Sequence, residues 1–172
     1  VCSSDLSSVQ NNKSEGDKPV ITVTIEPLRY FTEAIAGNNF NVISMVPKGS
    51  SPETYDPTPQ QLVDLAKSKA YFRIGYIGFE QTWMDKLTDN APHLQFFDTS
   101  RGIDLIYDSS HAHHHHDADE PHAHDSIQDD EHQHLLGVEP HVWSSAYNAQ
   151  IIAGNIVNAL CAIDKGNEIG RA

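Results

Sequence analysis

The residues best suited to chemistry in this sequence are histidines, and most of them lie in one short segment. The chain of 172 residues has eleven histidines, and nine of them lie between positions 111 and 134. They are His111, His113, His114, His115, His116, His122, His124, His132 and His134. The same segment contains seven Asp or Glu residues but no Lys or Arg. Because imidazole is a common zinc and copper ligand and carboxylates add oxygen donors, the segment indicates metal binding.

The composition of this segment also decides what kind of metal binding to expect. A stretch so polar and charged cannot bury enough apolar surface to fold, so we expect a disordered insertion over residues 109–135, here called the His-rich insertion. It lacks the fixed ligand spacing of a closed structural zinc site. We therefore expect it to bind several ions weakly, and the alternative is a solvated loop without a role.

Two further candidate metal ligands, Glu53 and His141, lie outside the His-rich insertion. Alone, a loop carboxylate is usually solvated, and a lone histidine is usually hydrogen-bonded within its loop. Their positions make the pair more informative, because we expect both loops at one edge of a sheet. An ordered metal site needs three or four donors. Two donors therefore predict half of a site, and no tight binding of a single ion by this chain alone.

The elements that must position these donors alternate between strand and helix. Strands are predicted over Val20–Ile25, Val42–Val46, Ala70–Ile74 and Leu94–Asp98. Helices are predicted over residues 28–36, 59–68, 79–87 and 145–163, the second of them starting at Thr58 and Pro59. This order predicts an α/β fold with a four-stranded parallel sheet and helices on both faces. Ligands of such sheets bind outside the carboxyl ends of the strands, where the loop of residues 48–58 is expected.

Length, charge and hydropathy narrow the possible functions. The chain is long enough to bury the core of one ordinary domain. Its net charge of -13 repels nucleic-acid phosphates and argues against nucleic-acid binding. No apolar run comes near the ~20 residues that a membrane-spanning helix needs. Two cysteines make no disulfide framework, and Cys161 is expected to be a buried thiol on the last helix.

Both ends of the chain have an unusual composition. Residues Val1–Leu6 and Glu168–Ala172 resemble translated sequencing-adapter DNA, because codons for Ser-Ser-Asp-Leu, read as the reverse complement, can encode Ile-Gly-Arg. We therefore interpret these ends as non-native and the chain as a gene fragment that lacks its signal segment. The alternative is a lipidated Cys2 after signal cleavage. Residues 7–18 are predicted to be a flexible polar tether.

Several stretches of the sequence, in a fixed order, resemble one protein family. They are VTIEPLRYFTEAIAG, VPKGSSPETYDPTPQQLVDLAKSKAYFRIG, the Gly-Phe-Glu of residues 78–80, the His-rich insertion and EPHVWSSAYNAQIIAGNIVNAL. The sequence resembles the amino-terminal lobe of the metal-binding solute-binding proteins of ABC transporters, particularly their zinc-uptake branch. The resemblance covers nearly everything from Val20 to Ile163.

The resemblance implies a domain organisation and a set of ligands. Residues 19–163 would form the amino-terminal lobe of a two-lobed receptor, with an interlobe helix starting at residues 145–163. Residues 1–18 would be a non-native end plus tether, and residues 164–172 a truncated or non-native end. His141 matches the ligand of the family's Pro-His-Val/Ala-Trp motif. Glu53 stands where the family usually has a histidine, and a carboxylate suits manganese as well as zinc.

The resemblance also implies a function without catalysis. A monomeric extracytoplasmic protein, periplasmic or membrane-anchored as a lipoprotein, would enclose Zn2+ between two lobes and deliver it to an ABC permease. The His-rich insertion would gather or sense zinc, and it favours zinc over Mn2+ or Fe2+, which are the alternative cargoes. A metal-dependent enzyme is disfavoured because the sequence has no His-Glu-x-x-His run, no Gly-x-Ser-x-Gly elbow and no phosphate loop. A free-standing metal buffer remains the third hypothesis.

Overall fold

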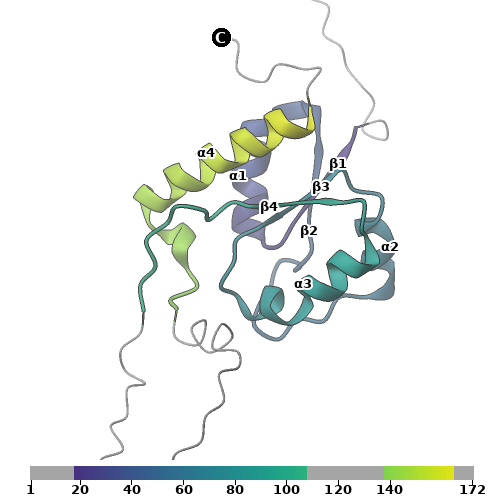
Figure 1. The fold of residues 1–172 in the computed structure, drawn as a ribbon, viewed down its shortest axis with the longest axis horizontal. Helices are drawn as coiled ribbons and strands as arrows, with labels where there is room; N and C mark the ends of the chain where they lie inside the picture. Colours follow the sequence, from purple (N-terminus) through teal and green to yellow (C-terminus); the bar gives the residue numbers. More distant parts are fainter. Residues whose placement is uncertain (1–17, 108–137, 165–172) are drawn as a thin grey trace, which may run out of the picture.

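The strands of the chain form a parallel sheet (Figure 1). The computed structural model describes residues 18–107 and 138–164. Its strands are β1 (Val20–Val23), β2 (Asn41–Ser44), β3 (Ala70–Arg73) and β4 (Gln95–Asp98), in the order β2-β1-β3-β4. Ile21 of the central strand β1 pairs with Val42 on one side and with Ala70 on the other. The predicted four-stranded parallel sheet is confirmed within the described residues.

The helices cover both faces of this sheet, which confirms the second part of the fold prediction. They are α1 (Glu26–Ala36), α2 (Pro59–Leu65), α3 (Gly78–Asn90) and α4 (Ala146–Ile163), with short 3-10 helices at Gly37–Asn39 and Val142–Ser144. Figure 1 shows α1 and α4 together on one face and α2 and α3 on the other. Parallel strands require crossover connections, and helical crossovers place apolar helix faces against the sheet.

Local sequence signals explain where α2 and α1 begin and end. The Thr58 hydroxyl accepts a hydrogen bond from the Gln61 amide at 3.3 Å, and the Gln61 side chain accepts one from the Thr58 amide at 2.9 Å. This capping box, with Pro59 in the first turn, confirms the predicted start of α2. The helix ends at Leu65, slightly before the expected end. Helix α1 stops at Gly37, whose φ of 56° is in the left-handed region that favours glycine.

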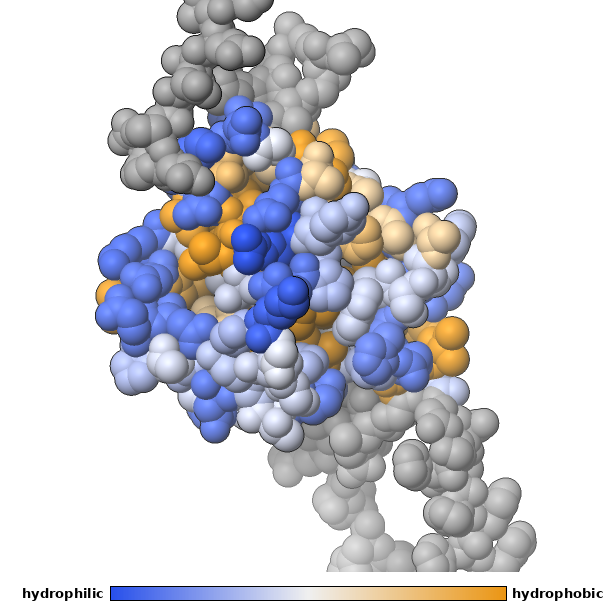
Figure 2. Space-filling model, turned by 180° about the vertical axis from the view of Figure 1, so that it is seen from behind, coloured by the Kyte–Doolittle hydropathy of each residue, from blue (hydrophilic) through white to orange (hydrophobic). Residues whose placement is uncertain are grey.

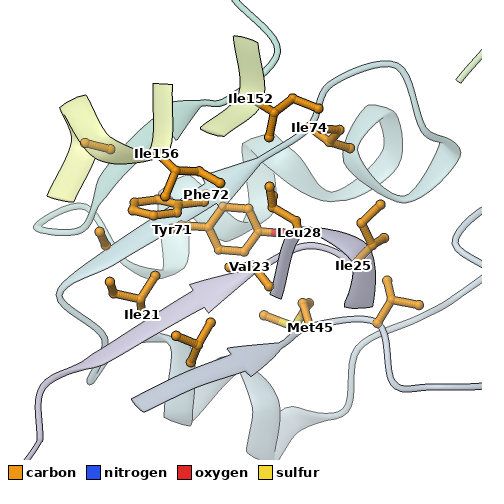
Figure 3. Close-up of a cluster of buried hydrophobic side chains, with 14 of the residues drawn as sticks. Ile21, Val23, Ile25, Leu28, Met45, Tyr71, Phe72, Ile74, Ile152 and Ile156 are labelled. Carbon is orange, nitrogen blue, oxygen red and sulfur yellow. The ribbon is translucent and has the colours of Figure 1, made fainter. Parts of the chain in front are cut away.

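The hydrophobic core lies on both sides of the central strands β1 and β3. Ile21, Val23, Tyr71 and Phe72 are fully buried, and Figure 3 shows them between residues of the surrounding helices, including Ile152 and Ile156. Because helices cover both faces, side chains of both faces are buried: consecutive residues of β3 are buried apolar ones, and the polar Thr22 of β1 is buried as well. The rigid sheet is the platform from which the loops at its carboxyl edge extend.

Helix α4 differs from the sequence-based expectations in two ways. By length and hydropathy alone it could cross a membrane, although 22% of its residues are buried within the structure. Length and hydropathy are weak evidence of a membrane-spanning helix. One side of α4, with Ile152, Ile156 and Leu160, is fully buried in the core of this domain. The prediction of a buried Cys161 is wrong, because its side chain is exposed. Cys161 lies two and a half helical turns after Ile152 and so is on the opposite side of α4.

The outer surface is mainly hydrophilic on the face opposite to that of Figure 1. Figure 2 shows that hydrophobic side chains on this face form several separate patches between polar ones. Exposed apolar residues scattered in this way are normal for globular proteins. The large exposed hydrophobic residues of the described chain belong to different elements, for example Tyr30 on α1, Val63 on α2 and Tyr147 on α4.

Candidate metal centre

A pocket of about 270 Å³ lies at the carboxyl edge of the sheet, where the turn from β1 into α1, with Ile25 and Glu26, meets two segments that are far apart in the sequence. The loop after β2 contributes Val46, Pro47 and Pro52, and the segment before α4 contributes His141 and Trp143. The expectation that both loops lie at one sheet edge is therefore confirmed. Most of the exposed lining is apolar, so a polar ligand in this pocket would depend on few donors.

His141 is an exposed residue whose ring is oriented by a neighbouring carboxylate. Its Nδ1 atom lies 2.5 Å from Oε1 of Glu139, and its backbone amide donates to the same oxygen at 3.1 Å. A carboxylate can only accept hydrogen bonds, so Nδ1 carries the proton in this contact. In the neutral ring the lone pair is then on Nε2, which is the atom left for a metal ion.

The backbone around His141 is held by several further contacts. Ser144 donates to the His141 carbonyl through its hydroxyl at 2.7 Å and through its amide at 3.0 Å. The Trp143 ring packs edge-on against the imidazole, with centroids 5.2 Å apart. Upstream, the Glu139 amide donates to the Ile106 carbonyl at 2.8 Å. His141 therefore has a fixed backbone although its side chain is exposed.

Glu53 is also exposed, and its carboxylate faces the start of α3. Its Oε2 atom accepts a hydrogen bond from the Gly78 amide at 3.0 Å. Next to it, the Phe79 amide donates to the Pro52 carbonyl at 2.8 Å. The indole of Trp83 donates to Asp56 at 3.1 Å, which is a third link between this loop and α3. The positive end of the helix dipole favours a carboxylate in this position.

The structure thus brings the two predicted donors to one sheet edge without joining them in one cluster. His141 and Pro52 line the same pocket, whereas Glu53 is not among the lining residues. Within residues 18–107 and 138–164, no group of three or more His, Cys, Asp or Glu side chains could hold a metal ion. The metal roles of Glu53 and His141 stay predictions. The nine histidines of the His-rich insertion lie outside the described residues.

Two residues to which sequence reasoning assigned no role support this edge. Glu139 could have been found from its position two residues before His141, since second carboxylates commonly orient metal-binding histidines. Glu80 had no such signal, because an acidic residue in the first turn of a helix is usually exposed. It is in fact 3% exposed.

The buried Glu80 carboxylate accepts hydrogen bonds from the turn that follows β3. Its Oε1 receives the Ile74 amide at 2.9 Å, and its Oε2 receives the Gly75 amide at 2.6 Å. Burial raises the pKa of Glu80 above its ordinary value, while the Thr24 hydroxyl, the two amides and the charge of Arg73 act in the opposite direction. Burial and the charge of Glu80 also raise the pKa of Tyr71.

Comparison with known proteins gives a consistent result. The family described as zinc-uptake complex component A, periplasmic (ZnuA), matches residues 21–169. The zinc-binding protein AdcA of Streptococcus pyogenes serotype M3 is 26% identical, over 90% of this chain and 30% of its own length. The manganese ABC transporter substrate-binding lipoprotein PsaA of Streptococcus pneumoniae is 30% identical, over 97% of this chain and 47% of its own.

A solved structure supports the same relationship at the level of the fold. A crystal structure of a ZnuA deletion mutant with zinc bound superposes with a TM-score of 0.68. It is 31% identical to this chain and covers 87% of it, whereas the chain covers 48% of that protein. The chain thus spans about half the length, or less, of the proteins it matches. Because the family match extends over nearly the whole described fold, the chain belongs to the ZnuA family of periplasmic zinc-uptake components.

Proposed function

We propose that this chain is the amino-terminal lobe of an extracytoplasmic receptor that captures Zn2+ through His141 and Glu53 and delivers it to an ABC permease. The observation that carries the proposal is the contact between Glu139 and Nδ1 of His141, which leaves Nε2 as the metal-binding atom at the edge of the pocket. AdcA is named as zinc-binding, and a ZnuA relative was crystallised with zinc. Both names favour zinc as the cargo.

A second lobe would complete the site. Zinc takes three or four protein donors, and the described residues offer no group of three. The missing donors would come from a part of the protein that faces the pocket across a cleft. Enclosure between two lobes would exclude solvent without any reaction of the ion, so we propose a transport receptor and no catalysis. Such a receptor would act as a monomer, in the periplasm or attached to the membrane as a lipoprotein.

Manganese is the second candidate cargo, and two observations favour it. Glu53 supplies a hard oxygen, which suits Mn2+ as well as Zn2+. PsaA, which is 30% identical, is named as a manganese transporter component. The histidines of the insertion favour zinc, because imidazole binds Zn2+ more strongly than Mn2+.

The His-rich insertion would gather zinc close to the site or respond to its abundance. Tyr107 and Val138, on either side of it, form an antiparallel bridge. Val138 is followed three residues later by His141, so the bridge that flanks the insertion is close in the chain to the proposed ligand. Ions bound there would dissociate at a short distance from the pocket. If the insertion were instead the whole function, the protein would be a metal buffer.

The proposal is tested on the protein encoded by the complete gene, with His141→Ala compared with His93→Ala. His93 is an exposed residue of the loop before the amino end of β4, and so it lies away from the carboxyl edge of the sheet. Its Nε2 contacts the Ala66 carbonyl at 2.8 Å. Calorimetric titration with Zn2+ and with Mn2+ should give one tight site that is lost in the first variant and kept in the second. A tight site that survives His141→Ala would overturn the proposal.

A separate variant distinguishes a transport receptor from a metal buffer. In this linker variant, residues 111–134 are replaced by a short Gly-Ser linker that leaves Tyr107 and Val138 able to pair. For a receptor, we expect fewer bound zinc ions per protein and an unchanged tight site. Loss of all zinc binding in the linker variant would identify the insertion as the function. An unchanged number of ions would remove the role proposed for the insertion.

A further inference from the structure

The buried carboxylate of Glu80 has no role in the function proposed so far. Burying a carboxylate without a cation beside it is unfavourable, so its burial calls for a reason. Both of its oxygens accept backbone amides, from Ile74 and from Gly75, at the point where β3 ends. These two amides begin the turn that leads from β3 into α3. Glu80 itself is in the first turn of α3, so its side chain ties the start of the helix to the end of the strand.

The turn between β3 and α3 needs such support because its backbone is unusual. Gly75 and Tyr76 both have positive φ, at 75° and 59°. Glycine adopts this region readily, whereas a tyrosine there is uncommon and unfavourable. Among the described residues, Tyr76 alone has positive φ without being a glycine. A turn held in this conformation has a defined exit direction, and that direction decides where the first amide of α3 points.

The first amide of α3 points at Glu53. The Gly78 N–H donates to Oε2 of Glu53 at 3.0 Å. Position 78 also leaves no room for a side chain, because a Cβ atom there would lie 2.5 Å from Oε2 of Glu53 and 3.0 Å from its carbonyl oxygen. A close approach of this kind requires glycine. The position of the Glu53 carboxylate is therefore fixed by the backbone of α3.

The contact with Gly78 affects how Glu53 could bind a metal ion. The amide takes one lone pair of Oε2 and leaves Oε1 as the more accessible oxygen, so a metal would be bound through Oε1 as a single-oxygen ligand. Such ligation fits the tetrahedral shell of zinc, whereas the hard cations often take both oxygens of a carboxylate. Hydrogen bonds to ligating carboxylates are also what holds them in place around a metal ion.

We propose that Glu80 is a positioning residue for metal capture, which holds the turn of residues 74–78 so that the Gly78 amide orients Glu53 as a single-oxygen ligand. This inference rests on the proposed function, because it requires Glu53 to bind the ion. Glu80 touches neither the ion nor Glu53. It acts through the backbone that connects its two amide partners to Gly78.

The test is a double-mutant cycle for Zn2+ binding in the 172-residue chain with the same linker in place of residues 111–134, with the imidazole NMR signals of its two histidines as the readout. His141 reports binding, and His93 is an internal control, since both remain when residues 111–134 are replaced. This readout measures weak affinities, as expected for a lobe with two donors. Glu80→Gln keeps the size of the side chain but replaces one acceptor oxygen with a donor. Asp85→Asn, an exposed residue of α3, controls for the lost charge.

We expect Glu80→Gln to weaken zinc binding about 10-fold when Glu53 is present. In a Glu53→Ala background the same substitution should change the affinity less than about twofold, because the residue through which it acts is gone. Asp85→Asn should have no effect in either background. An equal loss in both backgrounds, or no loss beside Glu53, would overturn the inference.

Gly78→Ala gives the same information without disturbing the core, in case Glu80→Gln impairs folding. The added methyl group must displace Glu53, so binding should weaken by a similar factor and only when Glu53 is present. An unchanged affinity in Gly78→Ala would contradict the inference. If Glu53→Ala leaves the response of His141 intact, Glu53 is no ligand: the inference and the ligand role of Glu53 fail, whereas zinc capture through His141 stands. If the His141 signals do not respond to zinc, both the inference and the proposed function fail.

Discussion

The imidazole of His141 and the carboxylate of Glu139 are joined by a hydrogen bond of 2.5 Å between Nδ1 and Oε1. The same Oε1 atom accepts the backbone amide of His141, so one oxygen fixes both the backbone and the ring. Both side chains are more than half exposed, at 64% and 53%. Packing alone therefore does not hold the ring in place, and the carboxylate is the main determinant of its orientation.

Glu139→Gln should weaken zinc binding about 10-fold, as expected when the outer partner of a metal-binding histidine is altered. The amide oxygen can still accept the Nδ1 proton, but the negative charge that strengthens this hydrogen bond is lost. The measurement is a competitive zinc titration of the complete protein, with Glu33→Gln on α1 as the control. An unchanged affinity would mean that the contact with Glu139 does not contribute to metal binding by His141.

Glu80 should make the stability of the fold depend on pH. Burial raises the pKa of Glu80 above 4.5, against the effect of Thr24 and the two amides. The folded state therefore holds the proton more tightly than the unfolded state. Its contribution to stability is complete below about pH 4.5 and is lost as the pH rises through the raised pKa.

The measurement is urea unfolding of the linker variant with and without Glu80→Gln, from about pH 4 to about pH 8. Other acidic groups titrate equally in both proteins, so the difference between the two unfolding free energies isolates Glu80. As the pH rises, we expect the free energy of unfolding of the protein with Glu80 to fall relative to that of the Glu80→Gln variant. Arg73 and Tyr71 are the other titratable groups that act on Glu80 or respond to it. A flat difference would contradict the prediction.

Helix α4 offers a matched pair of substitutions that separates its buried side from its outer side. Ile156 is fully buried, whereas its neighbour Val157 is 37% exposed. Ile156→Ala should lower the free energy of unfolding by about 2–5 kcal/mol, because it leaves a cavity in the core. Val157→Ala should change it by less than about 0.5 kcal/mol. Equal effects in chemical denaturation would show that α4 is not held in the core as the structure describes.

The fold was predictable from the sequence because its signals are local. The β-branched run at Val20–Val23 and the Thr58–Gln61 capping box each mark an element without reference to the rest of the chain. The alternation of strand and helix then restricts the sheet to a parallel one. Cys161 was misplaced because an apolar residue on an apolar helix does not by itself reveal which side is buried.

The arrangement of the site was predictable only in part. The sheet edge followed from the topology, since the loop after β2 must leave from the carboxyl end of that strand. The contact between Glu53 and Gly78 did not, because it joins residues 25 positions apart and depends on the direction of α3. The burial of Glu80 was hidden for the same reason. Its partners are the backbone amides of Ile74 and Gly75, and nearly every residue type has such an amide, so the sequence does not indicate the contact.

Glu53→His tests which ion the site prefers. The family usually has a histidine at this position, and imidazole is a softer ligand than carboxylate, so it binds Zn2+ far better than Mn2+. We expect the ratio of zinc to manganese affinity in the complete protein to rise about tenfold, with Glu33→His as a control for adding a surface histidine. The measurement is displacement of one ion by the other. An unchanged ratio would mean that Glu53 does not contact the ion and that its contact with Gly78 only ties the loop to α3.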